Sequence, residues 1–556
     1  MAEHADIDFR TSPEQYRHWR LDVEGCIATV TMAVDPNSTL HDGYELKSNS
    51  YDLGVDIELA DLVQRLRFEH PEVRVVVLTS DTDKLFCAGA NIQMLAASDH
   101  GHKVNFCKFT NETRNSIEEA TARSGQAWIA AINGTAAGGG YELALACEEI
   151  LLVDDRSSAV SLPEVPLLAV LPGTGGLTRL VDKRHVRRDL ADAFATRAEG
   201  VRGETALAWR LVDHLAPPSR FATLVGSRAA ALAAASDRPG TPGGMQLIPI
   251  ERALTADHLT YSTVRVELDR ASGTAAFTVA APDLAEPSTP EELLAAGAGA
   301  WLVRCARELD DAVLHLRANE AEIGTWTFRT IGNGEAVTAT EQVLARHPDH
   351  WLVREVRLLW GRVLKRLDVS SRTLIALVEP GSCFSGLLAE LLLVADRSFM
   401  LSGTWEDDED PPPPATITLG EANLGRFPMA NGLSRLHSRF WGRDDAYEAA
   451  RATVGRALAA AEAAAAELVT FTPDDLDWHD EVRLALEERN SFSPDALTAM
   501  EANYRFVGPE TMETKIFARL TAWQNWIFQR PNAVGPEGAL RRFGTGTRAS
   551  FDHRRV

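Results

Sequence analysis

The sequence predicts an α/β protein that is built from strand–helix–strand units and ends in a helical region. An alternating segment, residues 21–34, has the pattern of a strand hairpin, with Val23 and Ile27 among its apolar positions. Val55–Phe68 has the spacing of an amphipathic helix, and the valine-rich run Val73–Thr79 is typical of a strand buried on both faces. Strand, crossover helix and strand in this order indicate right-handed βαβ units.

A triple-glycine turn follows the next predicted strand. The apolar run Ala127–Ile132 leads into Gly138–Gly140, and a helix-forming run continues through Ala146. Glycine lets a ligand approach the backbone closely, and a helix N-terminus presents unpaired N–H groups that suit an anion. Glu142 lies just inside this helix, within reach of the same ligand. The alternative is a plain turn in which Glu142 balances the helix dipole.

Three further segments bring small or acidic residues to turns. Leu85–Ile92 is a small-residue turn shortly after a strand, and it can approach a ligand from the side opposite the triple glycine. Ser161–Pro166 is a tight segment that carries a second acid, Glu164. Leu171–Gly176 is another glycine-rich turn before a helix. For Glu164 the alternative role is a hydrogen bond that closes the turn.

The second half of the chain repeats this pattern after a linker at residues 237–244. Four later segments follow the order of the earlier hairpin, glycine turn, buried strand and acidic turn: Val264–Val279, Arg372–Gly386, Leu392–Arg397 and Leu419–Glu421. The repeat lacks the glycine triplet, and we expect Leu388 to stand in the position of Glu142. Without an acidic partner there, Glu421 is expected to be structural.

The end of the chain is predicted to be helical. Ala449–Leu468 is alanine-rich, and Lys515–Phe528 carries an apolar stripe that requires burial by the body of the protein or by another subunit. The basic tail Arg541–Val556 is expected to be solvated.

Composition limits the compartment and the partners. The chain has 556 residues and a formal net charge of -23, which argues against nucleic acid or an anionic membrane as the main partner. Its six cysteines are scattered without CxxC spacing, so we expect reduced thiols and no zinc site. The sequence shows no signal peptide and no membrane-spanning run, which predicts a cytoplasmic protein. Nothing indicates a metal or a redox cofactor.

The two small-residue turns and the two glutamates suggest one kind of chemistry. Backbone N–H groups from Ala90 and Gly139 can converge on one carbonyl oxygen and form an oxyanion hole. Glu142 and Glu164 can share a water, one as base and one as acid, if their surroundings separate their pKa values. This combination suits thioester chemistry through an enolate.

The motifs resemble those of the crotonase (enoyl-CoA hydratase/isomerase) superfamily. Phe86–Ile92, Asn133–Leu143, Pro163–Glu164 and Leu171–Leu180 carry the resemblance, which covers about residues 21–220. It implies a spiral of ββα repeats and coenzyme A thioester substrates. It places the oxyanion donors on Ala90 and Gly139 and the acid/base pair on Glu142 and Glu164.

The resemblance also implies a coenzyme A site and a third reactive residue. The expected coenzyme A contacts are Lys47, Ser48, Asn49, Ser50, Lys84 and Ala88. Cys107 lies on the helix that often lines the acyl pocket in this superfamily, so it is a candidate catalytic helper; the alternative is an inert, half-buried thiol. The chain departs from the family at Asn91, where aspartate is usual, and in its longer loop at Asp35–Leu53.

The doubled length is unusual for the superfamily and predicts three domains. These are a catalytic crotonase-like domain over residues 1–250, a degenerate crotonase-like scaffold over 251–445, and a helical region over 446–556 that suits oligomerisation as a homodimer. One intact and one degenerate unit resemble the branch that cleaves an epoxidised aromatic ring bound to coenzyme A. The alternatives are a hydratase or isomerase with a fused scaffold, and a non-catalytic acyl-CoA-binding protein.

Overall fold

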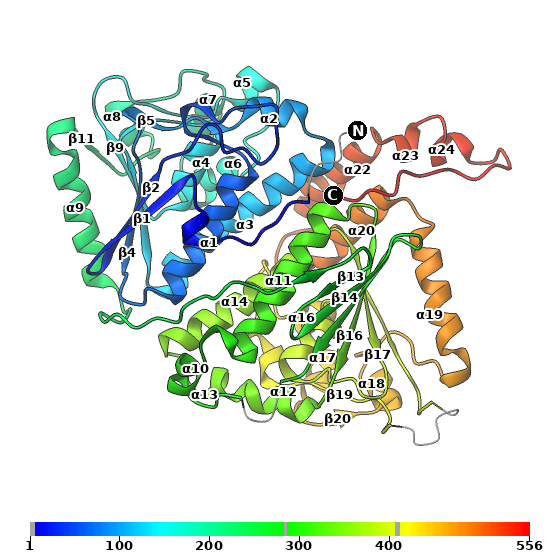
Figure 1. Cartoon of the computed structure of the whole chain (residues 1–556). Coiled ribbons are helices and arrows are strands. Elements are labelled where there is room, and N and C mark those ends of the chain that lie inside the picture. The colour runs from blue at the N-terminus through cyan, green and yellow to red at the C-terminus, as the bar shows by residue number, and fades with distance from the viewer. Residues whose placement is uncertain (1–5, 283–285, 406–411) are drawn as a thin grey trace. The chain divides into compact units, whose positions relative to one another are not determined.

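The protein is organised as two compact units, Met1–Pro249 and Ile250–Val556. The structure is a computed structural model that describes residues 6–282, 286–405 and 412–556 (Figure 1). Both units are α/β, and the helical segment predicted as a third domain belongs to the second unit. No helix in the described part of the chain is long and apolar enough to cross a membrane.

The first unit is built on a six-stranded sheet in the order β1-β2-β4-β7-β9-β11. The strands are β1 (Trp19–Glu24), β2 (Ile27–Met32), β4 (Val75–Ser80), β7 (Ala127–Ile132), β9 (Glu149–Val153) and β11 (His214–Ala216). β1 and β2 pair antiparallel, and all the other pairs are parallel. The predicted hairpin and the predicted valine-rich strand are therefore confirmed.

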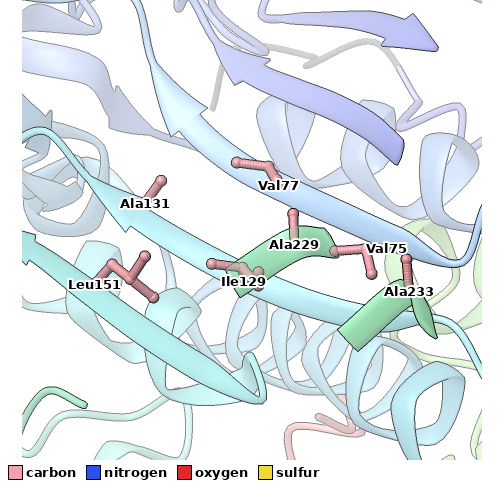
Figure 2. Packing of buried hydrophobic residues seen from close by; sticks show 7 residues of the cluster. All are labelled: Val75, Val77, Ile129, Ala131, Leu151, Ala229 and Ala233. Carbon is pink, nitrogen blue, oxygen red and sulfur yellow. The ribbon is translucent and has the colours of Figure 1, made fainter. Parts of the chain in front are cut away.

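The core of this sheet is closed by α9 (Pro218–Ala235), whose small side chains allow close approach (Figure 2). Alternate residues of a strand face the same side. Accordingly, Val75 and Val77 of β4 and Ile129 and Ala131 of β7 form one apolar surface. Seven buried residues make up this cluster: Val75, Val77, Ile129, Ala131, Leu151, Ala229 and Ala233.

Two smaller sheets are formed by short strands that follow the strands of the large sheet along the chain. They lead into the turns that the sequence predicted. One is a parallel sheet of β5 (Lys84–Cys87), β8 (Gly134–Ala137) and β10 (Val160–Ser161). The other pairs β3 (Ser50–Tyr51) with β6 (Gly89–Ala90). These strands connect directly to the segments that the sequence singled out.

Helices fill the connections of the first unit. They are α1 (Leu53–Phe68), α2 (Ile92–Ala97), α3 (His100–Ser124), α4 (Gly139–Ala146), α5 (Glu164–Leu168), α6 (Gly176–Thr178), the π-helical turn η3 (Arg179–Lys183), α7 (Arg188–Ala195) and α8 (Gly203–Ala208). α1 begins after Asp52, whose carboxylate accepts the Val55 N–H. α3 begins after Asp99 in the same way and ends at Gly125, which has a φ of 67°.

The second unit repeats this strand arrangement. Its seven-stranded sheet has the order β12-β13-β14-β15-β16-β17-β18, from β12 (Ala253–Leu254), β13 (His258–Thr260), β14 (Val264–Asp269), β15 (Thr274–Ala280), β16 (Thr325–Ile331), β17 (Thr373–Val378) and β18 (Arg397–Met400). β14 and β15 form an antiparallel hairpin, and β15 to β18 run parallel. The five strands β14 to β18 therefore match β1, β2, β4, β7 and β9 in order and direction.

The longer helices of the second unit are α11 (Trp301–Asn319) before β16, α14 (Trp351–Asp368) before β17, and α19 (Asp475–Asn490) and α20 (Pro494–Arg505) near the end. The alanine-rich run 449–468 is not one helix, so that expectation is wrong. It divides into the end of α17 (Asp444–Arg451), the short strand β20 (Ala457–Leu458) and α18 (Ala460–Ala465). Gly455, with a φ of 79°, interrupts the helical path.

The position of Glu142 is occupied in the second unit by Glu390, and the expectation for Leu388 is wrong. Gly386 adopts a φ of 48° after the third parallel strand, as Gly138 adopts 52° in the first unit. Glu390 follows Gly386 by four residues, as Glu142 follows Gly138. The sequence comparison missed this register because the loop after β17 is longer.

The basic tail contains one buried arginine, Arg555, among its described residues, so the expectation of a wholly solvated tail is wrong at this position. Arg555 is 3% exposed, and its guanidinium donates to Glu501 Oε2 at 2.5 Å and to the Gly324 carbonyl at 2.8 Å. The neighbouring Arg554 is exposed and pairs with Asp552. The tail is therefore anchored to the second unit by Arg555.

We expect Arg555→Ala to lower the free energy of unfolding by about 1.5–3 kcal/mol, because the buried Glu501 carboxylate loses its closest cation but keeps Arg489 at 3.5 Å and Arg505 at 3.9 Å. Urea unfolding followed by tryptophan fluorescence measures this change. Arg554→Ala is the control and is expected to change the free energy by less than about 0.5 kcal/mol. Equal effects of the two substitutions would show that Arg555 does not anchor the tail.

Candidate active site

The two predicted ligand-facing turns meet in the first unit. Gly89 in β6 has a φ of 90°, and a Cβ built on it would lie 2.8 Å from both the Gly139 nitrogen and the Ala137 oxygen. Only glycine fits such a close approach of two backbones. The sequence predicted both turns, and the structure brings Ala90 and the start of α4 next to each other.

The directions of the Ala90 and Gly139 N–H groups are determined by the strand and the helix to which these residues belong. Successive residues of a parallel strand direct their N–H groups to opposite sides. The Asn91 N–H donates to the Tyr51 oxygen at 2.8 Å, so the Ala90 N–H points away from β3. Gly139 is the first residue of α4, so its N–H has no acceptor within the helix.

Glu142 is a buried carboxylate held by one loop. It is 2% exposed, and its Oε1 accepts from the N–H groups of Thr174 at 3.0 Å and Gly176 at 2.7 Å. Its Oε2 accepts from the Thr174 hydroxyl. A Cβ on Gly176 would come within 2.9 Å of the Glu142 carboxylate, so this glycine is required for the contact.

Glu164 lies against Gly138, the first residue of the triple-glycine turn. It is the first residue of α5 and is half-buried, and a Cβ on Gly138 would lie 2.6 Å from its Oε1. Its Oε2 is buried and has no hydrogen-bond partner in the part of the chain that the structure describes. Burial, together with the negative charge of Glu142, raises the pKa of Glu164 to about 7. Glu164 is thus poised to exchange a proton near neutral pH.

Cys107 lies on α3 beside this pair. A Cβ on Gly173 would lie 3.2 Å from the Cys107 sulfur, and Gly173 belongs to the loop that holds Glu142. Burial, with a contribution from the charge of Glu142, raises the pKa of the thiol to about 11. At neutral pH the group is therefore a thiol, which is a weak nucleophile and a weak hydrogen-bond donor.

The expected coenzyme A segment runs along the first turn. The Ala88 N–H donates to the Ser48 oxygen at 3.2 Å, and the Cys87 thiol donates to the Asn49 oxygen at 3.0 Å. Ser50 is buried, and its hydroxyl accepts from the Asn91 amide at 3.1 Å. The structure therefore places residues 47–51 against residues 87–91.

Two of these side chains are committed to the fold, and others face outward. The Asn49 amide donates to the Ser80 hydroxyl at 2.8 Å and to the Phe86 carbonyl at 3.2 Å. Ser48, Ala88, Lys47 and Lys84 are exposed, and Lys47 pairs with Glu45 at 2.8 Å.

The departure from the family at Asn91 has a structural reason. The Asn91 Oδ1 accepts the Met94 N–H and caps α2, while its Nδ2 donates to the Glu45 carbonyl at 2.7 Å. An ionised aspartate has no such donor.

Three supporting residues were not predicted from the sequence. Arg114, on α3, donates through Nη2 to the Tyr51 hydroxyl at 2.9 Å and to the Gly139 carbonyl at 3.0 Å. The pKa of Arg114 is raised: burial, the largest effect, lowers it, but Tyr51, Asp56 and Glu142 together favour the cation more strongly. Tyr51, the partner of Arg114, is the second supporting residue, and Thr174 is the third, through its contacts with Glu142. A polar residue in a long helix and a threonine in a glycine loop carry no distinctive sequence signal.

The site thus combines two adjoining backbone amides, an anchored carboxylate and a carboxyl group that titrates near neutral pH. Such a set can bind the oxygen of a carbonyl group, stabilise negative charge on it and move protons beside it. Within the described residues, no group of three or more histidine, cysteine, aspartate or glutamate side chains is arranged to hold a metal ion.

Comparisons with known proteins agree on the family. The enoyl-CoA hydratase/isomerase family model matches residues 45–238. The benzoyl-CoA-dihydrodiol lyase of Aromatoleum evansii is 54% identical over 550 residues, which is 99% of this chain and 98% of that protein. The putative enoyl-CoA hydratase/isomerase YngF of Bacillus subtilis is 32% identical over 31% of this chain and 63% of its own length.

Solved structures of enoyl-CoA hydratases are similar to part of the chain. The crystal structure of an enoyl-CoA hydratase from Bacillus anthracis is 27% identical, with a TM-score of 0.33, over 39% of this chain and 76% of that chain.

Proposed function

Because the chain belongs to the benzoyl-CoA-dihydrodiol lyase branch of the enoyl-CoA hydratase/isomerase (crotonase) superfamily, we propose that it cleaves an aromatic-derived ring without oxygen. The substrate is 2,3-epoxy-2,3-dihydrobenzoyl-CoA, which takes up two waters. The products are 3,4-didehydroadipyl-CoA semialdehyde and formate, a step of aerobic benzoate degradation. The observation that carries the proposal is the identity with the Aromatoleum evansii lyase over nearly the whole length of both chains.

The roles of the site residues follow from their surroundings. The N–H groups of Ala90 and Gly139 bind the thioester oxygen and stabilise the enolate that ring opening requires. Glu142, anchored by Thr174 and Gly176, is the base that directs water, because its orientation is fixed. Glu164 gives and takes the proton, because its pKa of about 7 suits exchange at neutral pH.

The remaining contacts are assigned to substrate binding. Lys47, Ser48, Asn49, Ser50, Lys84 and Ala88 line the coenzyme A path, with Asn49 and Ser50 acting by shaping the backbone and Lys47 and Lys84 offering charge to the phosphates. Cys107 assists as a neutral thiol at the wall of the acyl pocket. The substrate carries coenzyme A, and we assign no other cofactor.

We assign one active site to each chain, and the second unit is a degenerate crotonase unit. Its residue in the position of Gly139 is Leu387, whose N–H donates to the Glu341 Oε2 at 2.6 Å. Glu341 is 3% exposed and lies against Gly386 and Gly420, where a Cβ would come within 2.9 Å of its carboxylate. The protein's own carboxylate thus occupies the place of a thioester oxygen.

We further propose a cytoplasmic homodimer that uses the C-terminal region. Phe517 is 73% exposed and Phe528 is 58% exposed, and both belong to the apolar stripe of residues 515–528. Further along, Phe543 is 90% exposed. Burial of such side chains against a second copy is more favourable than leaving them in water.

Product analysis tests the proposed reaction. Incubation of the protein with the 2,3-epoxide of benzoyl-CoA is expected to release one formate for each thioester consumed. A chain that hydrates linear enoyl-CoA and leaves the epoxide intact would instead be a hydratase with a fused scaffold. A chain that binds thioesters without turning over either compound would be a binding protein.

A further inference from the structure

A buried cation lies directly behind the Gly139 turn. Arg114 is 1% exposed, and its Nη2 atom donates to both the Gly139 carbonyl and the Tyr51 hydroxyl. Its Nη1 atom donates to the Thr110 carbonyl at 3.1 Å, one turn earlier on α3. Its Nε atom has no hydrogen-bond partner among the described residues. The guanidinium is therefore fixed toward the start of α4 by two of its three nitrogens.

Tyr51 connects this cation to both oxyanion turns. Its backbone oxygen accepts the Asn91 N–H at 2.8 Å and thereby sets the direction of the Ala90 amide. Its hydroxyl packs against Gly139, where a Cβ would overlap it. The Arg114 guanidinium also lies 5.6 Å from the centre of the Tyr51 ring. One residue thus contacts the Ala90 strand through its backbone and the Gly139 turn through its side chain.

Among the described residues, Arg114 pairs with the carboxylate of Asp56. Asp56 Oδ1 lies 3.9 Å from Arg114 Nη1, and burial raises the pKa of Asp56. Because the surroundings are dry, a positive charge in this position acts strongly on negative charge that develops at the turn.

We propose that Arg114 and Tyr51 are positioning residues that hold the Ala90 and Gly139 amides on one thioester oxygen, with the Arg114 charge further stabilising the enolate. This proposal rests on the proposed function of the site. It separates two tasks. Arg114 and Tyr51 tune the polarisation of the thioester carbonyl, whereas the two glutamates move protons.

The test uses the full chain with Arg114→Met, Arg114→Lys and Tyr51→Phe, and Arg238→Met as the control. Arg238 is also buried, but it donates to the carbonyls of Arg67, His70, Pro71 and Ser124, away from the site. Three quantities are measured: kcat and KM for the epoxide, the infrared stretching frequency of the isotope-labelled thioester carbonyl of bound benzoyl-CoA, and thermal unfolding.

We expect Arg114→Met to lower kcat by about 10²-fold, since small misplacement of catalytic groups has effects of this size. KM should change less than about threefold, and the carbonyl frequency should shift toward that of free benzoyl-CoA. Arg114→Lys keeps the charge and should recover part of both changes. Tyr51→Phe keeps the ring volume, so it is expected to fold and to lower kcat by about tenfold. Arg238→Met should lower stability and leave the carbonyl frequency unchanged.

Two results would overturn the proposal: a folded Arg114→Met protein with wild-type kcat and carbonyl frequency, or equal frequency shifts in Arg114→Met and Arg238→Met. A different result bears on the proposed function. If the wild-type protein itself binds benzoyl-CoA without any shift of the carbonyl frequency, the assignment of the oxyanion hole is wrong.

Discussion

Glu164→Gln is expected to lower kcat for ring cleavage by about 10³-fold, within the range of general acid–base catalysis. The Glu164 Oε2 atom is buried and has no hydrogen-bond partner among the described residues, and the pKa of the carboxyl is raised to about 7 by burial and by the charge of Glu142. Glutamine keeps the size and polarity but cannot exchange a proton. Binding of benzoyl-CoA should be retained, so the loss should be in kcat. Steady-state kinetics with the epoxide measures both parameters.

The same substitution should remove a pH dependence. The pKa of Glu164 is about 7 in the folded state, against its ordinary value of 4.5 in the unfolded chain, so the folded state binds more protons between these values. Its contribution to stability is therefore fully present below about pH 4.5 and is lost as the pH rises through 7. The corresponding limb of the kcat/KM profile and this part of the stability curve should both disappear in Glu164→Gln.

Glu421→Gln is the matched control, because Glu421 follows β19 (Ile417–Thr418) in the second unit as Glu164 follows β10 in the first. Glu421 is exposed, so its substitution should leave the kinetics unchanged. Wild-type turnover and an unchanged pH profile in Glu164→Gln would contradict the assigned proton transfer.

Gly139→Ala is expected to lower kcat by about 10²–10³-fold, the typical effect of losing one oxyanion donor. An alanine Cβ would overlap the Tyr51 hydroxyl and lie 2.8 Å from the Tyr51 Cζ. The Tyr51 ring cannot easily move away, because Arg114 donates a hydrogen bond to its hydroxyl and the Tyr51 backbone is paired in β3. The turn must therefore move, and the Gly139 N–H moves with it.

Gly226→Ala is the control for this substitution. Gly226 lies in α9, and a Cβ there meets no atom of the described residues within 4 Å. Alanine should be neutral or stabilising by up to about 1 kcal/mol in a helix and should leave kcat unchanged. The measurements are kcat and the unfolding temperature. A Gly139→Ala protein that is folded and fully active would exclude Gly139 as an oxyanion donor.

Local sequence patterns predicted the parts of the fold that depend on local spacing. The hairpin before Val75, the buried strands and the glycine turns all follow from alternation, valine content and the conformational freedom of glycine. The strand order of each unit required pairing between distant segments, which no local pattern encodes. The expectation that Leu388 corresponds to Glu142 was wrong for a related reason, because the longer loop after β17 shifted the alignment of the two units.

The sequence predicted the candidate site residues that lie in a recognisable motif. It did not predict the residues that hold those groups in position. Glu142 and Glu164 stood beside recognisable turns. The groups that orient Glu142 come from a loop more than thirty residues away, namely Thr174 and Gly176. Arg114 lies in a polar helix, and only the folded chain shows that it faces the Gly139 carbonyl.

The central claim is that the first unit binds the thioester oxygen between Ala90 and Gly139 and leaves the second unit without a substrate. A crystal structure of the full chain with bound benzoyl-CoA tests it most directly. We expect one ligand per chain, with its thioester oxygen about 2.7–3.1 Å from both amide nitrogens and the ring facing Glu142 and Glu164. A thioester oxygen directed away from these amides, or a ligand bound at Leu387 with Glu341 displaced, would contradict the account.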